Sequence, residues 1–117
     1  MLERIKGARI IRNQENLGFG PAFMHAVDAA AFEYLWFFNS DALLTDNGIE
    51  AALGNFVDTP GVGAVGGKIL LADGRLQEAG LIIWSDGSAV GYGRDEPQKP
   101  QYTFRGSVDY CSAVFLI

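Results

Sequence analysis

The apolar residues of this chain fall in short clusters that are separated by glycine-rich and polar turns. The first cluster, Ile10-Ile11, predicts a short strand. An alanine-rich run from Ala22 to Tyr34 follows Pro21 and predicts a helix with one apolar face. The uninterrupted run from Tyr34 to Phe38 predicts a strand that is buried on both faces, as in a parallel sheet. This order of elements indicates an α/β fold.

The rest of the chain predicts one more helix and then mainly strands and loops. Thr45 or Asp46 is expected to cap this helix, and Thr59-Pro60-Gly61 is expected to end it. Residues 108–117 predict a final strand. From Val62 onward, short apolar runs are separated by turn signals, which are Asp73-Gly74, Asp86-Gly87 and Gly91-Tyr92-Gly93.

The composition limits the classes of protein to which the chain can belong. With 117 residues, 49% of them hydrophobic, it forms at most one domain, and that domain has a real core. The formal net charge of -5 disfavours nucleic acid as a main partner. The apolar runs are far shorter than the roughly 20 residues that span a bilayer, and no signal-peptide pattern is present. The single cysteine cannot form an internal disulfide, so a cytoplasmic setting is expected.

Both ends of the chain carry apolar segments without polar flanks. Little precedes the predicted strand at Ile10-Ile11, and the segment from Val114 to Ile117 is apolar throughout. Native termini are usually solvated and loosely held, so we expect the chain to be the central piece of a longer protein, truncated at both ends. The edges beside the two segments are then expected to be uncovered and to favour self-association.

Polar residues follow the predicted aromatic strand, at the place where open α/β sheets bind their ligands. In one interpretation the Asp41 carboxylate binds a divalent cation together with diphosphate oxygens, and Asn39 orients a water or a ribose hydroxyl. In the other, Asn39-Ser40-Asp41 only turns the chain and caps the next element, which is a common role of Asn and Asp. The residues by themselves leave both interpretations open.

A second candidate is the glycine-rich turn from Asn16 to Gly20, ahead of the first predicted helix. Its backbone amides and the helix dipole favour an anion, although the turn lacks the third glycine of a dinucleotide fingerprint. His25 and Cys111 have no catalytic partners at a recognisable spacing, so no hydrolase is predicted. Trp84 is either a core residue or a surface on which a sugar stacks.

Three features occur in a characteristic order along the chain: the turn Asn16-Leu17-Gly18-Phe19, an alanine-rich helix, and an aromatic strand that ends in Phe38-Asn39-Ser40-Asp41-Ala42. This order resembles family 2 glycosyltransferases of the GT-A fold. The similarity continues through residues 67–69, 73–80, 82–87, 92–94 and 108–112, and it is closest to a bacterial surface-polysaccharide branch that is described as rhamnosyltransferase-like. The chain departs from the pattern at Phe23 and Met24, where many relatives have asparagine, and at Ala113, where glycine is usual.

The resemblance implies a fold and a set of site residues. The fold is the GT-A fold of nucleotide-diphospho-sugar transferases, with a Rossmann-like mixed sheet and flanking helices. Asn16 and Gly18 are assigned to the nucleotide, and Asp41, supported by Asn39, is assigned to the metal and the diphosphate. Residues 1–61 are then the nucleotide- and metal-binding part of a single partial domain, and residues 62–117 are its strand- and loop-rich acceptor-side part. The catalytic base is expected outside this chain.

The implied parent enzyme transfers a sugar, with inversion, from a nucleoside diphosphate sugar to a hydroxyl of a glycan or lipid-linked acceptor, in polysaccharide or cell-envelope synthesis. Mg²⁺ or Mn²⁺ is the implied cofactor, and the parent is expected in the cytoplasm or at the inner face of the membrane. The fragment alone is expected to be inactive. Two alternatives stay open, namely a sugar-nucleotide-binding module without turnover, and nucleotidyl transfer. Nucleotidyl transfer is disfavoured, because the sequence lacks a glycine-rich triphosphate loop followed by lysine.

Overall fold

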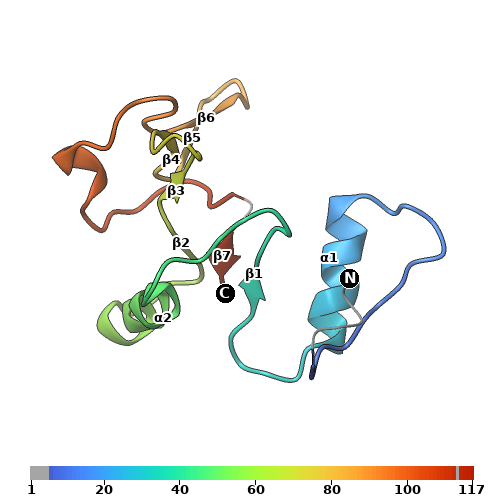
Figure 1. Ribbon diagram of the computed structural model, residues 1–117. Coiled ribbons are helices and arrows are strands. Elements are labelled where there is room, and N and C mark those ends of the chain that lie inside the picture. The colour runs from blue at the N-terminus through green and yellow to red at the C-terminus, as the bar shows by residue number, and fades with distance from the viewer. Residues whose placement is uncertain (1–5, 113) are drawn as a thin grey trace. The chain divides into compact units, whose positions relative to one another are not determined.

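The computed structural model describes residues 6–112 and 114–117, and the chain divides into two compact units, Met1–Leu35 and Trp36–Ile117 (Figure 1). Residues 1–5 and Ala113, the position at which the resemblance expects glycine, lie outside the described residues. Among the helices that are described, none has both the length and the apolar character needed to cross a bilayer.

The first unit contains the helix α1 (Phe19–Ala29) and the irregular segment that precedes it. Gly18 has a φ of 76°, which a glycine adopts at little cost, and the helix begins directly after it. Pro21 therefore lies in the first turn, where its missing N–H is not needed. The predicted helix is confirmed, but it starts and ends earlier than expected, because Ala30 is already extended.

The prediction of a strand at Ile10-Ile11, which the structure describes, is wrong. Both side chains are exposed and the segment has no strand conformation. A strand needs a neighbour that completes its backbone hydrogen bonds, and the described part of this unit offers only a helix. Side chains hold the segment to α1 instead: Arg9 Nη1 donates to the Ala29 carbonyl oxygen at 3.2 Å, and Asn13 Oδ1 lies 3.1 Å from His25 Nδ1.

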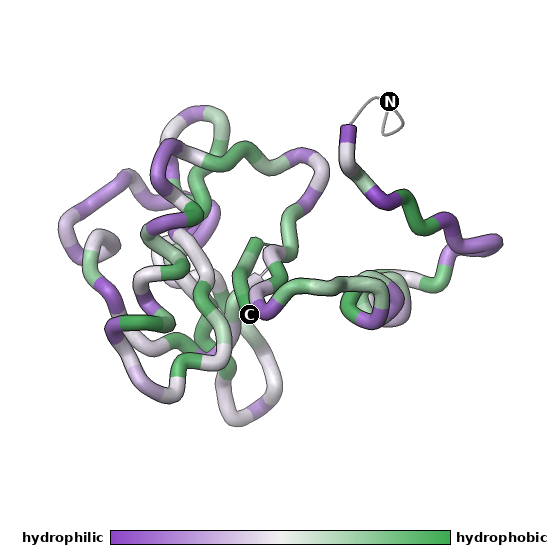
Figure 2. Tube along the Cα trace, turned by 90° about the horizontal axis from the view of Figure 1, so that it is seen from below, coloured by the Kyte–Doolittle hydropathy of each residue, from purple (hydrophilic) through white to green (hydrophobic). Residues whose placement is uncertain are grey.

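The second unit contains a sheet of three short strands, β1 (Trp36–Phe37), β2 (Val65–Gly66) and β7 (Phe115–Leu116). β7 lies in the middle and is antiparallel to both neighbours, with Leu116 opposite Trp36 on one side and Val65 on the other. Leu116 is buried, and the Phe115 ring stacks on Phe37 with centroids 4.9 Å apart. Figure 2 shows the hydrophobic colour of this strand at the C-terminus.

This sheet corrects two expectations. β1 is a half-buried edge strand in an antiparallel pair, and not a strand buried on both faces of a parallel sheet. The segment from Val114 to Ile117 does not leave an uncovered edge, because β7 pairs on both sides. The reason in both cases is that β7, which is distant in sequence, inserts between β1 and β2 and satisfies backbone groups of each.

The helix α2 (Gly48–Asp58) packs against β2. Its N-cap is Asn47, in a left-handed conformation with a φ of 61°. The prediction that Thr45 or Asp46 caps the helix is therefore wrong, since an extra turn separates them from it and the Thr45 carbonyl oxygen accepts the Gly48 N–H at 3.2 Å. The predicted end is confirmed, because Thr59 is the C-cap and is followed by Pro60 and Gly61.

Two antiparallel hairpins follow: β3 (Ile69–Leu70) with β4 (Leu76–Glu78), and β5 (Leu81–Ile83) with β6 (Ala89–Gly91). Both predicted hairpin turns are confirmed. Asp73 Oδ1 accepts the Arg75 N–H at 3.0 Å, and Asp86 Oδ1 accepts the Ser88 N–H at 2.9 Å, each at a glycine of positive φ. The predicted final strand shortens to β7 and a single bridge between Leu81 and Tyr110.

The buried centre of the hairpin region lies between β4 and a short 3-10 helix, η2 (Pro100–Tyr102). Leu76 is completely buried, and Tyr102 is 5% exposed. A Cβ on Gly93 would lie 2.7 Å from the Tyr102 ring and 3.1 Å from Leu76 Cδ1, so the predicted turn at Gly91-Tyr92-Gly93 brings the backbone into this centre. The β4 strand is thereby packed against both η2 and the turn at Gly93.

Candidate functional site

The segment Asn39-Ser40-Asp41 lies directly after β1 and forms a turn. The Ala42 N–H donates to the Asn39 carbonyl oxygen at 3.1 Å, which closes the turn around Ser40 and Asp41. All three residues are exposed. The Asp41 carboxylate forms no hydrogen bond and no ion pair with any residue that the structure describes. The predicted turn is thus confirmed, but the segment does not cap the next helix, whose N-cap is Asn47. Both Asp41 oxygens are available to a ligand.

Asn16 and Gly18 lie together in a different unit, at the start of α1. Asn16 Oδ1 accepts the Gly18 N–H at 3.0 Å, so the two residues form one Asx turn. No side chain caps the first turn of the helix. The sequence therefore predicts the local geometry correctly, with the backbone N–H groups of the first helical turn left without a side-chain partner.

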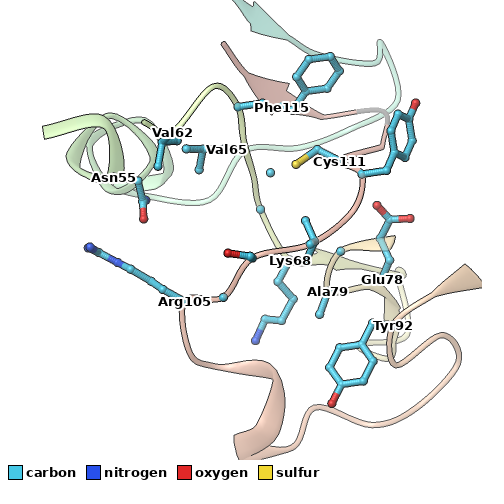
Figure 3. A pocket seen from close by; sticks show the side chains of 18 of the residues that line it. Asn55, Val62, Val65, Lys68, Glu78, Ala79, Tyr92, Arg105, Cys111 and Phe115 are labelled. Carbon is cyan, nitrogen blue, oxygen red and sulfur yellow. The ribbon is translucent and has the colours of Figure 1, made fainter. Parts of the chain in front are cut away.

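A pocket of about 1300 Å³ lies inside the second unit. Figure 3 shows Asn55 and Val62 on one side of it and Glu78 and Tyr92 on the other. Much of its wall is glycine and alanine, including Gly66 and Gly80. The charged residues of its lining are two cations and two carboxylates, so the wall carries no large net charge; they are Lys68, Arg105, Glu78 and Asp109.

Three of these charged groups are occupied by other parts of the chain. Lys68 Nζ donates to Gln98 Oε1 at 2.9 Å, and Arg105 Nη1 lies 3.1 Å from Asp58 Oδ2. Asp109 Oδ2 accepts the Ile83 N–H at 3.0 Å. These contacts connect the long loop after β6 to α2 and to the hairpins, and they shape the pocket wall.

Glu78 is a charged residue that is 5% exposed. Ser112 Oγ donates to its Oε1 at 2.5 Å, across 34 residues of sequence. No cation in the described ranges, 6–112 and 114–117, forms an ion pair with it. Sequence reasoning did not single out Glu78. The available signal was its position two residues after Leu76, because residues i and i+2 of a strand share a face.

Cys111 lines the same pocket and is half-buried. Burial raises the pKa of its thiol, and this outweighs the lowering effect of a hydrogen bond from the Gly66 backbone. The thiol therefore stays protonated near neutral pH and is a poor nucleophile. This agrees with the expectation that Cys111 acts as a small buried residue.

The structure brings the candidate residues together in pairs. Asn16 and Gly18 belong to the unit Met1–Leu35, and Asn39 and Asp41 belong to the unit Trp36–Ile117. No group of three or more His, Cys, Asp or Glu side chains that could hold a metal ion occurs among residues 6–112 and 114–117. A cation at Asp41 would therefore depend on ligand oxygens and water to complete its coordination.

A family model described as glycosyl transferase family 2 matches residues 1–115. The chain belongs to glycosyl transferase family 2. Family 2 membership supports the GT-A fold of nucleotide-sugar transferases and glycosyl transfer from a nucleotide sugar to an acceptor. No match was found among curated proteins or among solved structures. The helices and small sheets described above do not conflict with the family fold.

Proposed function

We propose that this family 2 chain is the donor-binding and acceptor-facing part of an inverting, metal-dependent glycosyltransferase that acts in surface-polysaccharide or cell-envelope synthesis, of the rhamnosyltransferase-like branch. The observation that carries the proposal is the Asp41 carboxylate, which lies in the turn that follows β1 and is exposed and without a partner in the described structure. An exposed carboxylate keeps its hydration in the folded state, and without a partner in the described structure it is available to a cation.

The residues present fit a magnesium or manganese ion that is bound mainly through a diphosphate. Mg²⁺ is commonly held by one or two protein carboxylates together with substrate phosphates and water. The described residues offer one such carboxylate, Asp41, and no larger ligand cluster. When bound, the ion would stabilise the negative charge that develops on the leaving diphosphate. Asp41 holds the ion, and Asn39 orients a neighbouring water or hydroxyl.

The turn at the start of α1 supports the nucleotide assignment independently. The Asn16 side chain is fixed by the Gly18 N–H, and its amide NH₂ is left without a partner in the described unit. The uncapped N–H groups of the first helical turn favour an anion. We infer that Asn16 and Gly18 contact the nucleotide and that the catalytic base belongs to a part of the parent enzyme outside this chain.

Isothermal titration of the 117-residue chain with UDP, GDP and dTDP, each with Mn²⁺, tests this proposal. The wild type is expected to bind at least one of them, and Asp41→Ala is expected to weaken the Mn²⁺-dependent binding by about tenfold or more, because one charge-assisted contact is lost. Asp46→Ala is the matched control, since Asp46 is an exposed aspartate in the turn before α2 and is also free of partners in the described structure.

Equal affinity of the wild type and Asp41→Ala would contradict the metal assignment. Transfer assays with the full-length protein separate the three candidate activities. Sugar release from a nucleoside diphosphate sugar onto an acceptor indicates the glycosyltransferase, whereas nucleotide binding without any transfer indicates a sugar-nucleotide-binding module. Pyrophosphate release from a nucleoside triphosphate would instead indicate nucleotidyl transfer.

A further inference from the structure

Glu78 is in an unusual state for a carboxylate. It is 5% exposed, and within the described structure it accepts one hydrogen bond, from Ser112. Removing a carboxylate from water costs several kcal/mol unless its oxygens are paired, and an ionised carboxylate can accept about four hydrogen bonds. Its second oxygen, Oε2, has no hydrogen-bond donor among the described residues. Glu78 therefore has unused acceptor capacity at a costly position.

The backbone directly after Glu78 is held by hydrogen bonds to Tyr92. The Ala79 N–H donates to the Tyr92 carbonyl oxygen and the Tyr92 N–H donates to the Gly80 carbonyl oxygen, both at 2.9 Å. Gly91 leaves room beside Glu78, because a Cβ there would lie 3.1 Å from Glu78 Cβ. The backbone beside Glu78 is thus fixed, and the Ser112 hydroxyl restrains one carboxylate oxygen before any ligand arrives, which lowers the entropy cost of binding.

Ser112 is fixed from the other side of the pocket wall. The Leu81 N–H donates to the Tyr110 carbonyl oxygen at 3.1 Å, and the Asp109 N–H donates to the Leu81 carbonyl oxygen at 3.2 Å. These bonds attach the segment that carries Ser112 to β5. The Ser112 hydroxyl donates to Glu78 and keeps its own oxygen as an acceptor. The pair therefore offers acceptor oxygens on two neighbouring side chains.

The rest of the pocket indicates the class of ligand. Three of its four charged lining residues are paired with other parts of the chain, so Glu78 is the charged group in the described lining that keeps free hydrogen-bond acceptor capacity. Tyr92 and Tyr110 also line the pocket and are 38% and 51% exposed. An aromatic face beside fixed hydrogen-bond acceptors suits a neutral molecule with hydroxyl donors and apolar C–H faces, which is a sugar ring.

We propose that Glu78, together with Ser112, binds vicinal hydroxyl groups of a neutral saccharide in this pocket and thereby selects the acceptor. The inference rests on the proposed function, because it is the acceptor that a glycosyltransferase binds apart from its nucleotide donor. Glu78 acts here as a specificity-determining residue: two hydroxyl donors of one ring pair with Oε2 and with the Ser112 oxygen. A deoxy sugar that lacks one of these hydroxyls binds less tightly.

The first experiment measures binding of the 117-residue wild type to an array of neutral oligosaccharides. The glycan that binds best is then followed by amide hydrogen exchange. Protection is expected at residues 78–80, 92 and 110–112. An array without any bound glycan, or protection confined to other residues, overturns the proposal without any need for a variant.

The second experiment compares variants with that glycan. Glu78→Gln retains an oxygen that can accept from Ser112 but removes the charge, and it is expected to weaken binding by about tenfold or more, since charge-assisted hydrogen bonds are the strong ones. Glu50→Gln is the matched control and should bind as the wild type does, because Glu50 is exposed on α2 and does not line the pocket. Equal binding by Glu78→Gln and the wild type overturns the proposal.

Nucleotide binding by the same variants separates this inference from the proposed function. Glu78→Gln is expected to keep the Mn²⁺-dependent nucleotide affinity of the wild type, and Asp41→Ala is expected to keep the glycan affinity. A wild type that binds no nucleotide but binds a glycan through Glu78 contradicts the proposed donor site alone. A wild type that binds nucleotide through Asp41 while Glu78→Gln leaves glycan binding unchanged contradicts the inference alone.

Discussion

Two carboxylates of the second unit are in opposite environments. Asp41 lies in an exposed turn after β1 and has no partner in the described structure, whereas Glu78 lies in β4, is almost completely buried and accepts a hydrogen bond from Ser112. The turn around Asp41 is closed by backbone atoms, so its side chain contributes little to the fold. Glu78 contributes to both the fold and the pocket. Loss of Asp41 should change binding alone, and changes around Glu78 should change stability as well.

The largest effect is expected from the buried centre that supports β4. Leu76→Ala should lower the free energy of unfolding by about 2 to 5 kcal/mol, because it removes the completely buried side chain and leaves a cavity. Leu43→Ala, at a leucine that is 95% exposed, is the control and should change stability by less than about 0.5 kcal/mol. Urea unfolding followed by circular dichroism measures both, and equal stabilities would contradict the assignment of the core.

A smaller effect should distinguish the two carboxylate regions directly. Ser112→Ala removes the hydrogen-bond donor of a buried carboxylate and should cost about 1 to 3 kcal/mol of stability. Asp41→Ala should change stability by less than about 0.5 kcal/mol, because the turn is closed by the backbone. Urea unfolding followed by circular dichroism measures the stability of both variants. A loss for Asp41→Ala as large as that for Ser112→Ala would remove the contrast between the regions.

Acidification should loosen the hairpin turns by a smaller amount. The Ser88 hydroxyl and N–H lower the pKa of Asp86 below 3.8, and the Arg75 N–H and guanidinium lower the pKa of Asp73 in the same way. Because the pKa of each aspartate is lowered in the folded state, its charged form stabilises the turn at pH values above 3.8. This stabilisation is lost as the pH falls through the lowered pKa of the folded state.

The Ser88 amide resonance reports this transition. Its shift should titrate with a midpoint below 3.8, and in Asp86→Asn it should stay constant over the same range. Both aspartates are exposed, so the change should stay local to the hairpins. A midpoint above 3.8 would show that the hydrogen bonds from Ser88 do not stabilise the charged form.

The smallest effect concerns the rate at which the thiol of Cys111 reacts. Because burial raises its pKa, iodoacetamide should alkylate Cys111 in the folded chain more slowly than in the urea-unfolded chain at neutral pH. The rate should rise as the pH increases toward the raised pKa. Mass spectrometry measures both rates, and faster alkylation in the folded chain would indicate an activated thiol.

Local features of the fold were predictable from the sequence. Asp73-Gly74 and Asp86-Gly87 form the expected turns because the side chain of each aspartate bonds to a backbone N–H two residues later, and the glycine supplies the positive φ. The Asn16 to Gly18 turn before α1 follows the same rule. The prediction of a turn after the aromatic strand also needed only neighbouring residues.

Long-range features were not predictable in this way. The run from Tyr34 to Phe38 predicts a strand, but its hydropathy does not reveal that the partner is β7, or that the pair is antiparallel. Thr45 and Asp46 are good capping residues, yet α2 begins after Asn47. In each case the pattern allowed several arrangements: the distant strand β7 selected one for the aromatic run, and a local turn between Thr45 and Gly48 moved the start of α2.

Residue types and near neighbours specify the family, the turns, the approximate places of the two helices and the position of Asp41 after a strand. The place of β7 between β1 and β2, and the burial of Glu78 rather than another acidic residue in the pocket wall, follow from the packing of distant segments. Burial depends on which distant segments cover a side chain. Ser112 lies 34 residues from Glu78 in the sequence, and the tertiary fold brings its hydroxyl to the carboxylate.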